Sequence, residues 1–219
     1  MQSKGYLISF EGQDACGKST LVQELAKYFL ANGYTVYTVD EFSQSIVGNY
    51  LRILLTQDKF LRFGQDVKSS FTETLFITAD LYFQHEIEIM PRLRDQVIVL
   101  KDRHVDTIFA CQIPKIVKDY PEIKYENLYD WVERKLSFIT FPDLTFFLTL
   151  PLDIQIERIK SRGEAVSDSD IQIFKEREKI YRELASKYTD RIVVYENIKS
   201  IEMAVLEIGL IVKNHFYLV

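Results

Sequence analysis

Short, continuous runs of apolar residues alternate along the chain with longer segments in which apolar residues recur at helical spacing. The short runs are rich in β-branched and aromatic residues, so they predict strands. They occupy residues 6–10, 34–39, 97–100, 144–150 and 192–195. The continuous apolar runs over 97–100 and 144–150 are typical of central parallel strands that are covered on both faces.

The longer segments predict amphipathic helices, because their apolar residues fall three or four positions apart. The first begins after the strand over 6–10 and ends at Asn32-Gly33, a common helix stop. The segment over 68–90 is expected to end before Pro91 and, with the segment over 46–55, to flank a cleft. The remaining predicted helices cover residues 127–139, 152–160, 170–188 and 201–213. Strands alternating with helices predict an α/β fold with a doubly wound, five-stranded parallel sheet flanked by helices.

Composition narrows the class of protein. The chain has 219 residues, 47% hydrophobic and 27% charged, which favours one domain over residues 1–219. Its formal net charge of −5 provides no basic field to hold DNA or RNA. No apolar stretch approaches the roughly 18 residues of a membrane span. Cys16 and Cys111 have no metal-ligand spacing and form no disulfide framework. We therefore expect a soluble, cytoplasmic protein that binds neither nucleic acid nor membrane.

A phosphate-binding motif, G-x-x-x-x-G-K-[ST], lies between the first predicted strand and the first predicted helix. This setting lets backbone N–H groups and a helix N-terminus face the phosphates, as in P-loop NTPases. Lys18 is expected to reach the β- and γ-phosphates of ATP, and the Ser19 hydroxyl to bind Mg²⁺. The residues expected to bind the triphosphate are Gly12, Gln13, Asp14, Ala15, Cys16, Gly17, Lys18, Ser19 and Thr20.

A second cluster, Lys101-Asp102-Arg103-His104, directly follows the predicted strand over 97–100. Carboxyl ends of parallel strands share one edge of a sheet, so these side chains are expected beside the phosphate-binding motif. Asp102 could hold Mg²⁺ through water, and Arg103 could bind a phosphate with two hydrogen bonds. A surface ion pair between the two is the alternative. Beside a phosphate-binding loop, the pair favours phosphoryl transfer.

Three ordered motifs resemble those of the thymidylate kinase family. They are Phe10-Glu11-Gly12-x-Asp14-x-x-Gly17-Lys18-Ser19-Thr20, Asp102-Arg103-His104-x-x-Thr107-x-x-Ala110-x-Gln112, and Pro142-Asp143-Leu144 followed by Glu157-Arg158-Ile159-x-x-Arg162-Gly163. The resemblance implies a homodimeric, magnesium-dependent kinase with a short lid over residues 161–170. It would move the γ-phosphoryl group of ATP onto a nucleoside monophosphate, with dTMP as the default acceptor.

The resemblance also implies roles for individual residues. Asp14 would contact the acceptor sugar, Arg103 the acceptor phosphate, and Phe76 would stack on the acceptor base. Asp14 could instead cap a turn, and Phe76 could be a core residue. Arg158 and Arg162 would approach ATP, unless they are solvated helix-end cations. The expected catalytic residues are Lys18, Asp14, Asp102, Arg103 and Arg162; the expected acceptor-binding residues are Asp14, Glu41, Phe42, Arg52, Phe76, Asp80, Arg103 and Gln112.

Three departures from the family pattern concern missing arginines. No arginine is present in Asp40-Glu41-Phe42-Ser43-Gln44-Ser45, where the family binds the acceptor phosphate, and Asp80 stands where an arginine is expected four residues after Phe76. The third departure is that neither the loop interior over 13–16 nor the acidic segment over 163–170 carries an arginine, which leaves Arg162, at the edge of the lid, and Arg52 as candidate replacements. Two alternatives therefore stay open. One is a kinase for another nucleotide or nucleoside, and the other is a nucleotide-binding module without turnover.

Overall fold

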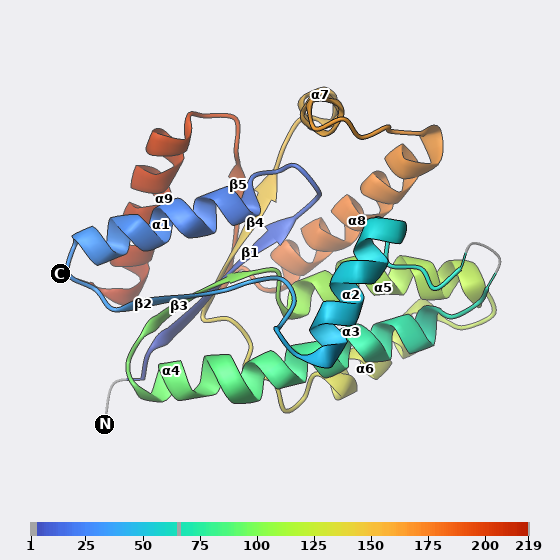
Figure 1. Cartoon of the computed structure of the whole chain (residues 1–219), viewed down its shortest axis with the longest axis horizontal. Coiled ribbons are helices and arrows are strands. Elements are labelled where there is room, and N and C mark those ends of the chain that lie inside the picture. The colour runs from blue at the N-terminus through green and yellow to red at the C-terminus, as the bar shows by residue number, and fades with distance from the viewer. Residues whose placement is uncertain (1–3, 65–66, 219) are drawn as a thin grey trace.

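The computed structural model describes residues 4–64 and 67–218. Within them, five strands form one sheet in the order β2-β3-β1-β4-β5, and every neighbouring pair is parallel. The strands are β1 (Tyr6–Gly12), β2 (Val36–Val39), β3 (Ile98–Asp102), β4 (Leu144–Thr149) and β5 (Ile192–Glu196). This arrangement, seen in Figure 1, confirms the predicted α/β fold with a doubly wound parallel sheet.

Helices cover both faces of the sheet (Figure 1). On one face α1 (Lys18–Ala31) and α9 (Ile201–Phe216) pack together over alternate side chains of the central strands, such as Ile8 and Phe146. The opposite face carries α2 (Ile46–Gln57), α3 (Ser70–Gln84), α4 (Met90–Arg94), α5 (Val105–Asp119), α6 (Tyr125–Lys135) and α8 (Asp168–Lys187). The short α7 (Leu152–Ser161) contacts the phosphate-binding loop through Ile159.

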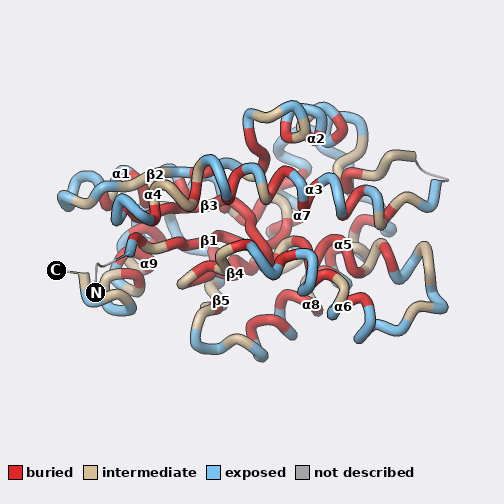
Figure 2. Tube along the Cα trace, turned by 90° about the horizontal axis from the view of Figure 1, so that it is seen from below, coloured by how far each residue is buried: buried red, intermediate tan, exposed pale blue. Residues whose placement is uncertain are grey.

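The central strands are buried along nearly their whole length, which matches their continuous apolar runs. Figure 2 shows this as buried trace through β1, β3 and β4, whereas the outer strands β2 and β5 are partly exposed. Asp102, predicted to follow its strand, is the last residue of β3. It therefore sits at the carboxyl edge of the sheet, next to the end of β1.

One predicted helix needs correction, and one helix was missed. The helix over 68–90 does not stop before Pro91, because a π-helical turn, η1 (His85–Ile89), links α3 directly to α4. Pro91 falls in the first turn of α4, where a proline without an N–H group is tolerated.

Helix α5 was not predicted. Its buried face includes polar residues such as Asp106 and Gln112, which obscure the apolar spacing, and Pro114 lies inside it.

None of the helices within residues 4–64 and 67–218 combines the length and apolar character needed to cross a membrane.

Candidate functional site

A cavity of about 830 Å³ opens beyond the carboxyl ends of β1 and β3, between the phosphate-binding loop and helices α2, α3, α5 and α8. It brings together most of the predicted site residues: Asp14, Ala15, Gly17, Lys18, Ser19, Thr20, Glu41, Phe42, Asp80, Asp102, Arg103, Gln112 and Arg162. Among the described residues, the predicted site residues that do not line the cavity are Gly12, Gln13, Cys16, Arg52, Phe76 and Arg158.

The phosphate-binding loop requires glycine at two positions. Gly12 has φ of 133°, and a Cβ there would lie 2.4 Å from the Leu148 carbonyl oxygen. Gly17 has φ of 94°, and a Cβ there would lie 2.6 Å from the Asn197 side-chain nitrogen. That Asn197 nitrogen donates a hydrogen bond to the Cys16 carbonyl at 2.8 Å. Asn197, which follows β5 and carries no motif, therefore fixes the loop from the far end of the chain.

Lys18 is buried at the start of α1 and already held in the loop. Its Nζ donates to the Gln13 carbonyl at 2.8 Å and lies 3.7 Å from Cys16 Sγ. The Gln13 side chain donates to the Phe174 carbonyl of α8 at 2.7 Å. Gln13 thus ties the loop to α8, while its backbone oxygen positions Lys18.

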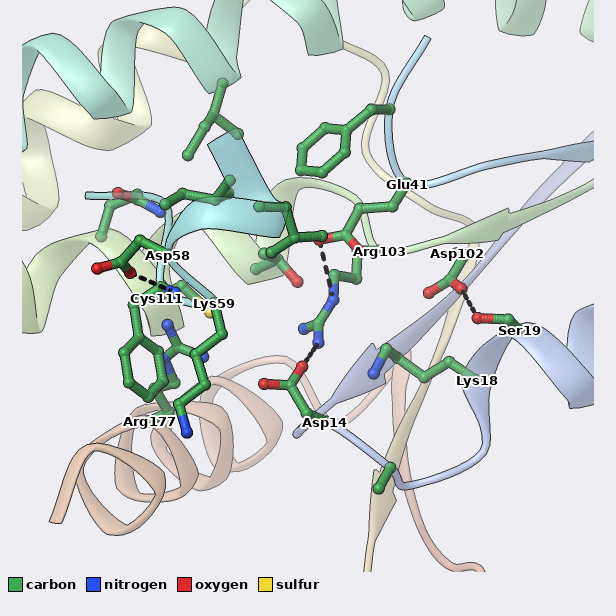
Figure 3. Close-up of a pocket in the computed structure, with 18 of the residues that line it drawn as sticks. Asp14, Lys18, Ser19, Glu41, Asp58, Lys59, Asp102, Arg103, Cys111 and Arg177 are labelled. Atoms are coloured by element: carbon green, nitrogen blue, oxygen red, sulfur yellow. Dashed lines mark hydrogen bonds and ion pairs between the residues drawn. The ribbon is translucent and has the colours of Figure 1, made fainter. Parts of the chain in front are cut away.

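Ser19 and Asp102 face each other across the loop. Ser19 Oγ donates to Asp102 Oδ2 at 2.5 Å, as Figure 3 shows. The other oxygen, Asp102 Oδ1, is buried without a hydrogen-bond partner among the described residues. An unpartnered carboxylate oxygen beside a hydroxyl fits a hard cation such as Mg²⁺, which prefers oxygen ligands and keeps several waters. These two residues could therefore hold the ion against a bound phosphate.

Arg103 lies at the centre of the cavity and is bound by two carboxylates. Its guanidinium donates to the Gly12 carbonyl at 2.8 Å and to Asp14 Oδ1 at 2.7 Å, and its Nε lies 3.2 Å from Glu41 Oε1 (Figure 3). Burial raises the pKa of Asp14, but Arg103 and Lys18 together hold it below its ordinary value. Burial raises the pKa of Glu41, and Arg103 only partly opposes that rise. Arg103 thus faces the cavity as a largely neutralised cation.

Two buried residues, Glu11 and Lys101, form hydrogen bonds with segments that line the cavity. Glu11, just before the loop, accepts hydrogen bonds from the His104 backbone N–H at 2.6 Å and from the Thr107 hydroxyl. Burial raises the pKa of Glu11 to about 7. Lys101 donates to the Asp40 carbonyl at 2.6 Å and so fixes the segment that carries Glu41; burial lowers the pKa of Lys101 to about 8.

Asp80 lines the cavity, yet its oxygens are occupied by the segment after β2. It accepts from the Ser43 backbone N–H at 2.9 Å, from the Ser43 hydroxyl, and from the Ser45 hydroxyl at 3.1 Å. Ser45 in turn caps α2 by accepting from the Gly48 N–H at 3.0 Å. The acidic residue at this position therefore stabilises the start of α2.

Two expected acceptor contacts lie elsewhere. Arg52 donates to the Ser43 carbonyl at 2.6 Å and to the Phe42 carbonyl, so backbone oxygens engage its guanidinium. Phe76 is 38% exposed and packs edge-on against Phe63, at the side of α3 that faces α2. The next residue, Ile77, lines the cavity instead, together with Leu81 one turn later.

The two arginines predicted to approach ATP differ in their surroundings. Arg158 approaches the Ala15 carbonyl at 3.5 Å and the Asn197 carbonyl at 3.3 Å, outside the described lining of the cavity. Arg162 caps the end of α7 and is exposed at the mouth of the cavity.

Sequence reasoning missed three cations that line the cavity. Lys59 pairs with Asp170 at 2.6 Å, and Arg62 pairs with Asp58 at 2.8 Å. Arg177 of α8 is 6% exposed and lies over the Phe60 ring at 5.0 Å. These three residues belong to no motif, and in the sequence they look like ordinary charged surface residues of a helix or a loop.

Comparison with known proteins agrees with this geometry. A family model described as thymidylate kinase matches residues 10–208. The thymidylate kinase of Rickettsia africae (strain ESF-5) is 28% identical over 217 residues, covering 97% of this chain and 97% of that protein. The thymidylate kinase of Nitrosomonas eutropha (strain DSM 101675 / C91 / Nm57) is 30% identical over 201 residues, covering 91% of this chain and 88% of that protein.

Solved structures show the same fold. A thymidylate kinase structure from Candida albicans has a TM-score of 0.73 at 22% identity, covering 98% of this chain and 95% of that chain. A thymidylate kinase crystal structure from Ehrlichia chaffeensis has a TM-score of 0.67 at 24% identity, covering 96% and 99%. With a family match over most of its length and the phosphate-binding loop facing Asp102 and Arg103, the chain belongs to the thymidylate kinase family.

Proposed function

We propose that this protein transfers the γ-phosphoryl group of ATP to dTMP, forming ADP and dTDP. The observation that carries the proposal is the convergence of Lys18, Ser19, Asp102 and Arg103 on one cavity at the carboxyl edge of the sheet. The names of the relatives support dTMP as the acceptor.

On the donor side, the loop N–H groups and the N-terminus of α1 would bind the triphosphate of ATP. Lys18 would exchange its bond with the Gln13 carbonyl for a phosphate oxygen. Ser19 and Asp102 would hold Mg²⁺, which neutralises phosphate charge when bound. Arg162, which is exposed at the mouth of the cavity in the proposed lid over residues 161–170, would add positive charge near the transferred phosphoryl group.

On the acceptor side, Arg103 would contact the phosphate of dTMP. An oxygen of that phosphate attacks the γ-phosphorus of ATP, the bond to the β–γ bridging oxygen breaks, and ADP leaves with the electron pair. Positioning and electrostatic stabilisation account for such a reaction without a covalent enzyme intermediate. Asp14, which accepts a hydrogen bond from Arg103 at 2.7 Å, would also contact the acceptor sugar.

Neither alternative is favoured. A changed acceptor was suggested by Asp80, but the serine segment occupies the Asp80 oxygens. A binding module without turnover was suggested by missing arginines, yet Lys59, Arg62 and Arg177 supply other cations around the cavity.

We also propose a cytoplasmic homodimer. The outer side of α3 and η1 exposes the large apolar side chains of Leu75, Phe83 and Ile87, which a second copy could cover. The cytoplasmic location follows from the proposed substrates, which are free nucleotides.

A coupled assay of ADP release tests the reaction. We expect Mg²⁺-dependent turnover with dTMP, faster than with thymidine or with the monophosphates of the other bases. Lys18→Ala should lower the rate by about a hundredfold or more, since a cation at the transferred phosphates is lost. Lys27→Ala, on the exposed side of the same helix, is the matched control and should keep full activity. Turnover that survives Lys18→Ala, or a stronger preference for another acceptor, would refute the proposal.

A further inference from the structure

The carboxylates around Arg103 make the acceptor site unfavourable for the phosphate of the acceptor nucleotide, because they already pair with its positive charge. Arg103 is bracketed by Asp14 and Glu41, and Asp102 lies beside it in sequence at the same edge. An incoming phosphate dianion would meet one cation and two or three carboxylates, which is an unfavourable balance in a partly buried site. A second cation is needed on the acceptor side of the cavity.

Arg177 is the buried cation that meets this need. Its guanidinium lines the cavity with 6% of the residue exposed, and it has no hydrogen-bond or ion-pair partner in the described part of the chain. Figure 3 shows Asp14 lying between Lys18 and Arg177, and both cations contribute to the lowered pKa of Asp14. Arg177 therefore reaches from α8 into the same cavity as Arg103.

The remaining cavity cations are less suited. Lys59 is occupied by Asp170 and by the Ala165 carbonyl, and Arg62 by Asp58. Arg52 is occupied by backbone carbonyls. Arg162 is exposed at the lid and would have to be ordered on binding, whereas Arg177 is already oriented by its packing on the Phe60 ring.

We propose that Arg177 binds the phosphate group of the acceptor nucleotide, together with Arg103, and so replaces the arginine that is absent after β2. A guanidinium can grip a phosphate with two parallel hydrogen bonds, which explains why a buried arginine is kept unpaired in this position. The inference rests on the proposed phosphoryl transfer and adds to it the residue that selects a phosphorylated acceptor.

Binding of dTMP and thymidine, measured by calorimetry, separates this role from a structural one, because the two ligands differ by the phosphate. Arg177→Ala should weaken dTMP binding by about 10- to 100-fold, the range for a lost charge-assisted pair. Thymidine binding and the binding of a non-hydrolysable ATP analogue should change by less than about twofold, and Arg177→Lys should restore part of the dTMP affinity.

Arg182→Ala is the matched control, since Arg182 lies on the same helix but pairs with Glu178 away from the cavity. Equal weakening of dTMP and thymidine would show that Arg177 only supports the fold, and weaker binding of the ATP analogue would place it on the donor side. Either result overturns the inference, as does unchanged dTMP binding. If the wild-type protein releases no ADP with dTMP, the proposed function itself fails, which is a different outcome from a wild-type kinase unaffected by the Arg177 variants.

Discussion

Replacing Glu11 by glutamine tests whether this buried carboxyl is held protonated. Glu11 is fully buried, and burial together with the nearby Asp106 carboxylate raises its pKa from an ordinary 4.5 to about 7. The Thr107 hydroxyl, the His104 N–H and Arg103 oppose the rise but do not cancel it.

The sign of the effect follows from proton binding. Between pH 4.5 and pH 7 the folded protein keeps the Glu11 proton that the unfolded chain has lost, so the free energy of unfolding falls as the pH rises. At about 1.4 kcal/mol per pKa unit, the full effect is about 3 kcal/mol above pH 7. Glutamine resembles the protonated acid in shape and cannot ionise, so Glu11→Gln should not lose this stability.

The assay is urea unfolding of both proteins at several pH values from 5 to 8. The difference between the variant and the wild type isolates Glu11, because the other titrating groups are common to both. We expect the stability of Glu11→Gln relative to the wild type to rise by about 2–3 kcal/mol across this interval. Parallel pH curves would refute the argument and would mean that the hydrogen bonds to Glu11 stabilise its ionised form as strongly as burial disfavours it.

Two further substitutions test neighbouring groups. Lys101→Met should remove a pH dependence of opposite sign. Burial lowers the pKa of Lys101 from 10.5 to about 8, so between these pH values the folded protein has lost a proton that the unfolded chain still holds, and the wild type gains stability as the pH rises. Urea unfolding should show that the variant lacks this gain. Asp80→Asn should lower the stability by about 1–3 kcal/mol by weakening the bonds to Ser43 and Ser45, and should leave the ratio of rates for dTMP and other acceptors unchanged; a tenfold change in that ratio in the ADP-release assay would mean that Asp80 contacts the acceptor.

Much of the fold could be predicted from sequence, because its signals are local. Continuous apolar runs predicted all five strands that the described residues form. The phosphate-binding motif and Asp102-Arg103 could be brought to one edge without coordinates, since parallel strands share the direction of their carboxyl ends. Helix α5 was missed because it is buried nearly all round and its buried polar residues interrupt the apolar period.

The sequence pattern could not predict which of two neighbouring apolar residues in α3 lines the cavity. Phe76 and Ile77 are both apolar, and α3 packs on two sides, with one side toward α2 and the other lining the cavity. A helical period assigns a residue to a face only when one face is polar. The choice of Phe76 as the residue that stacks on the acceptor base therefore stays a prediction, and its packing against Tyr50 and Phe63 favours a structural role.

Whether a charge is available for a ligand was equally hidden, because pairing is decided by distant parts of the chain. The sequence does not show which of Arg52, Arg103 and Arg177 keeps its charge free for a ligand, and it gave no reason to select Arg177. In the folded protein, backbone carbonyls occupy Arg52, two carboxylates neutralise Arg103, and Arg177 faces the cavity unpaired within the described residues. An arginine absent from its expected segment thus need not mean a missing function, since a phosphate responds to where the charge lies in space and not to which helix or loop supplies it.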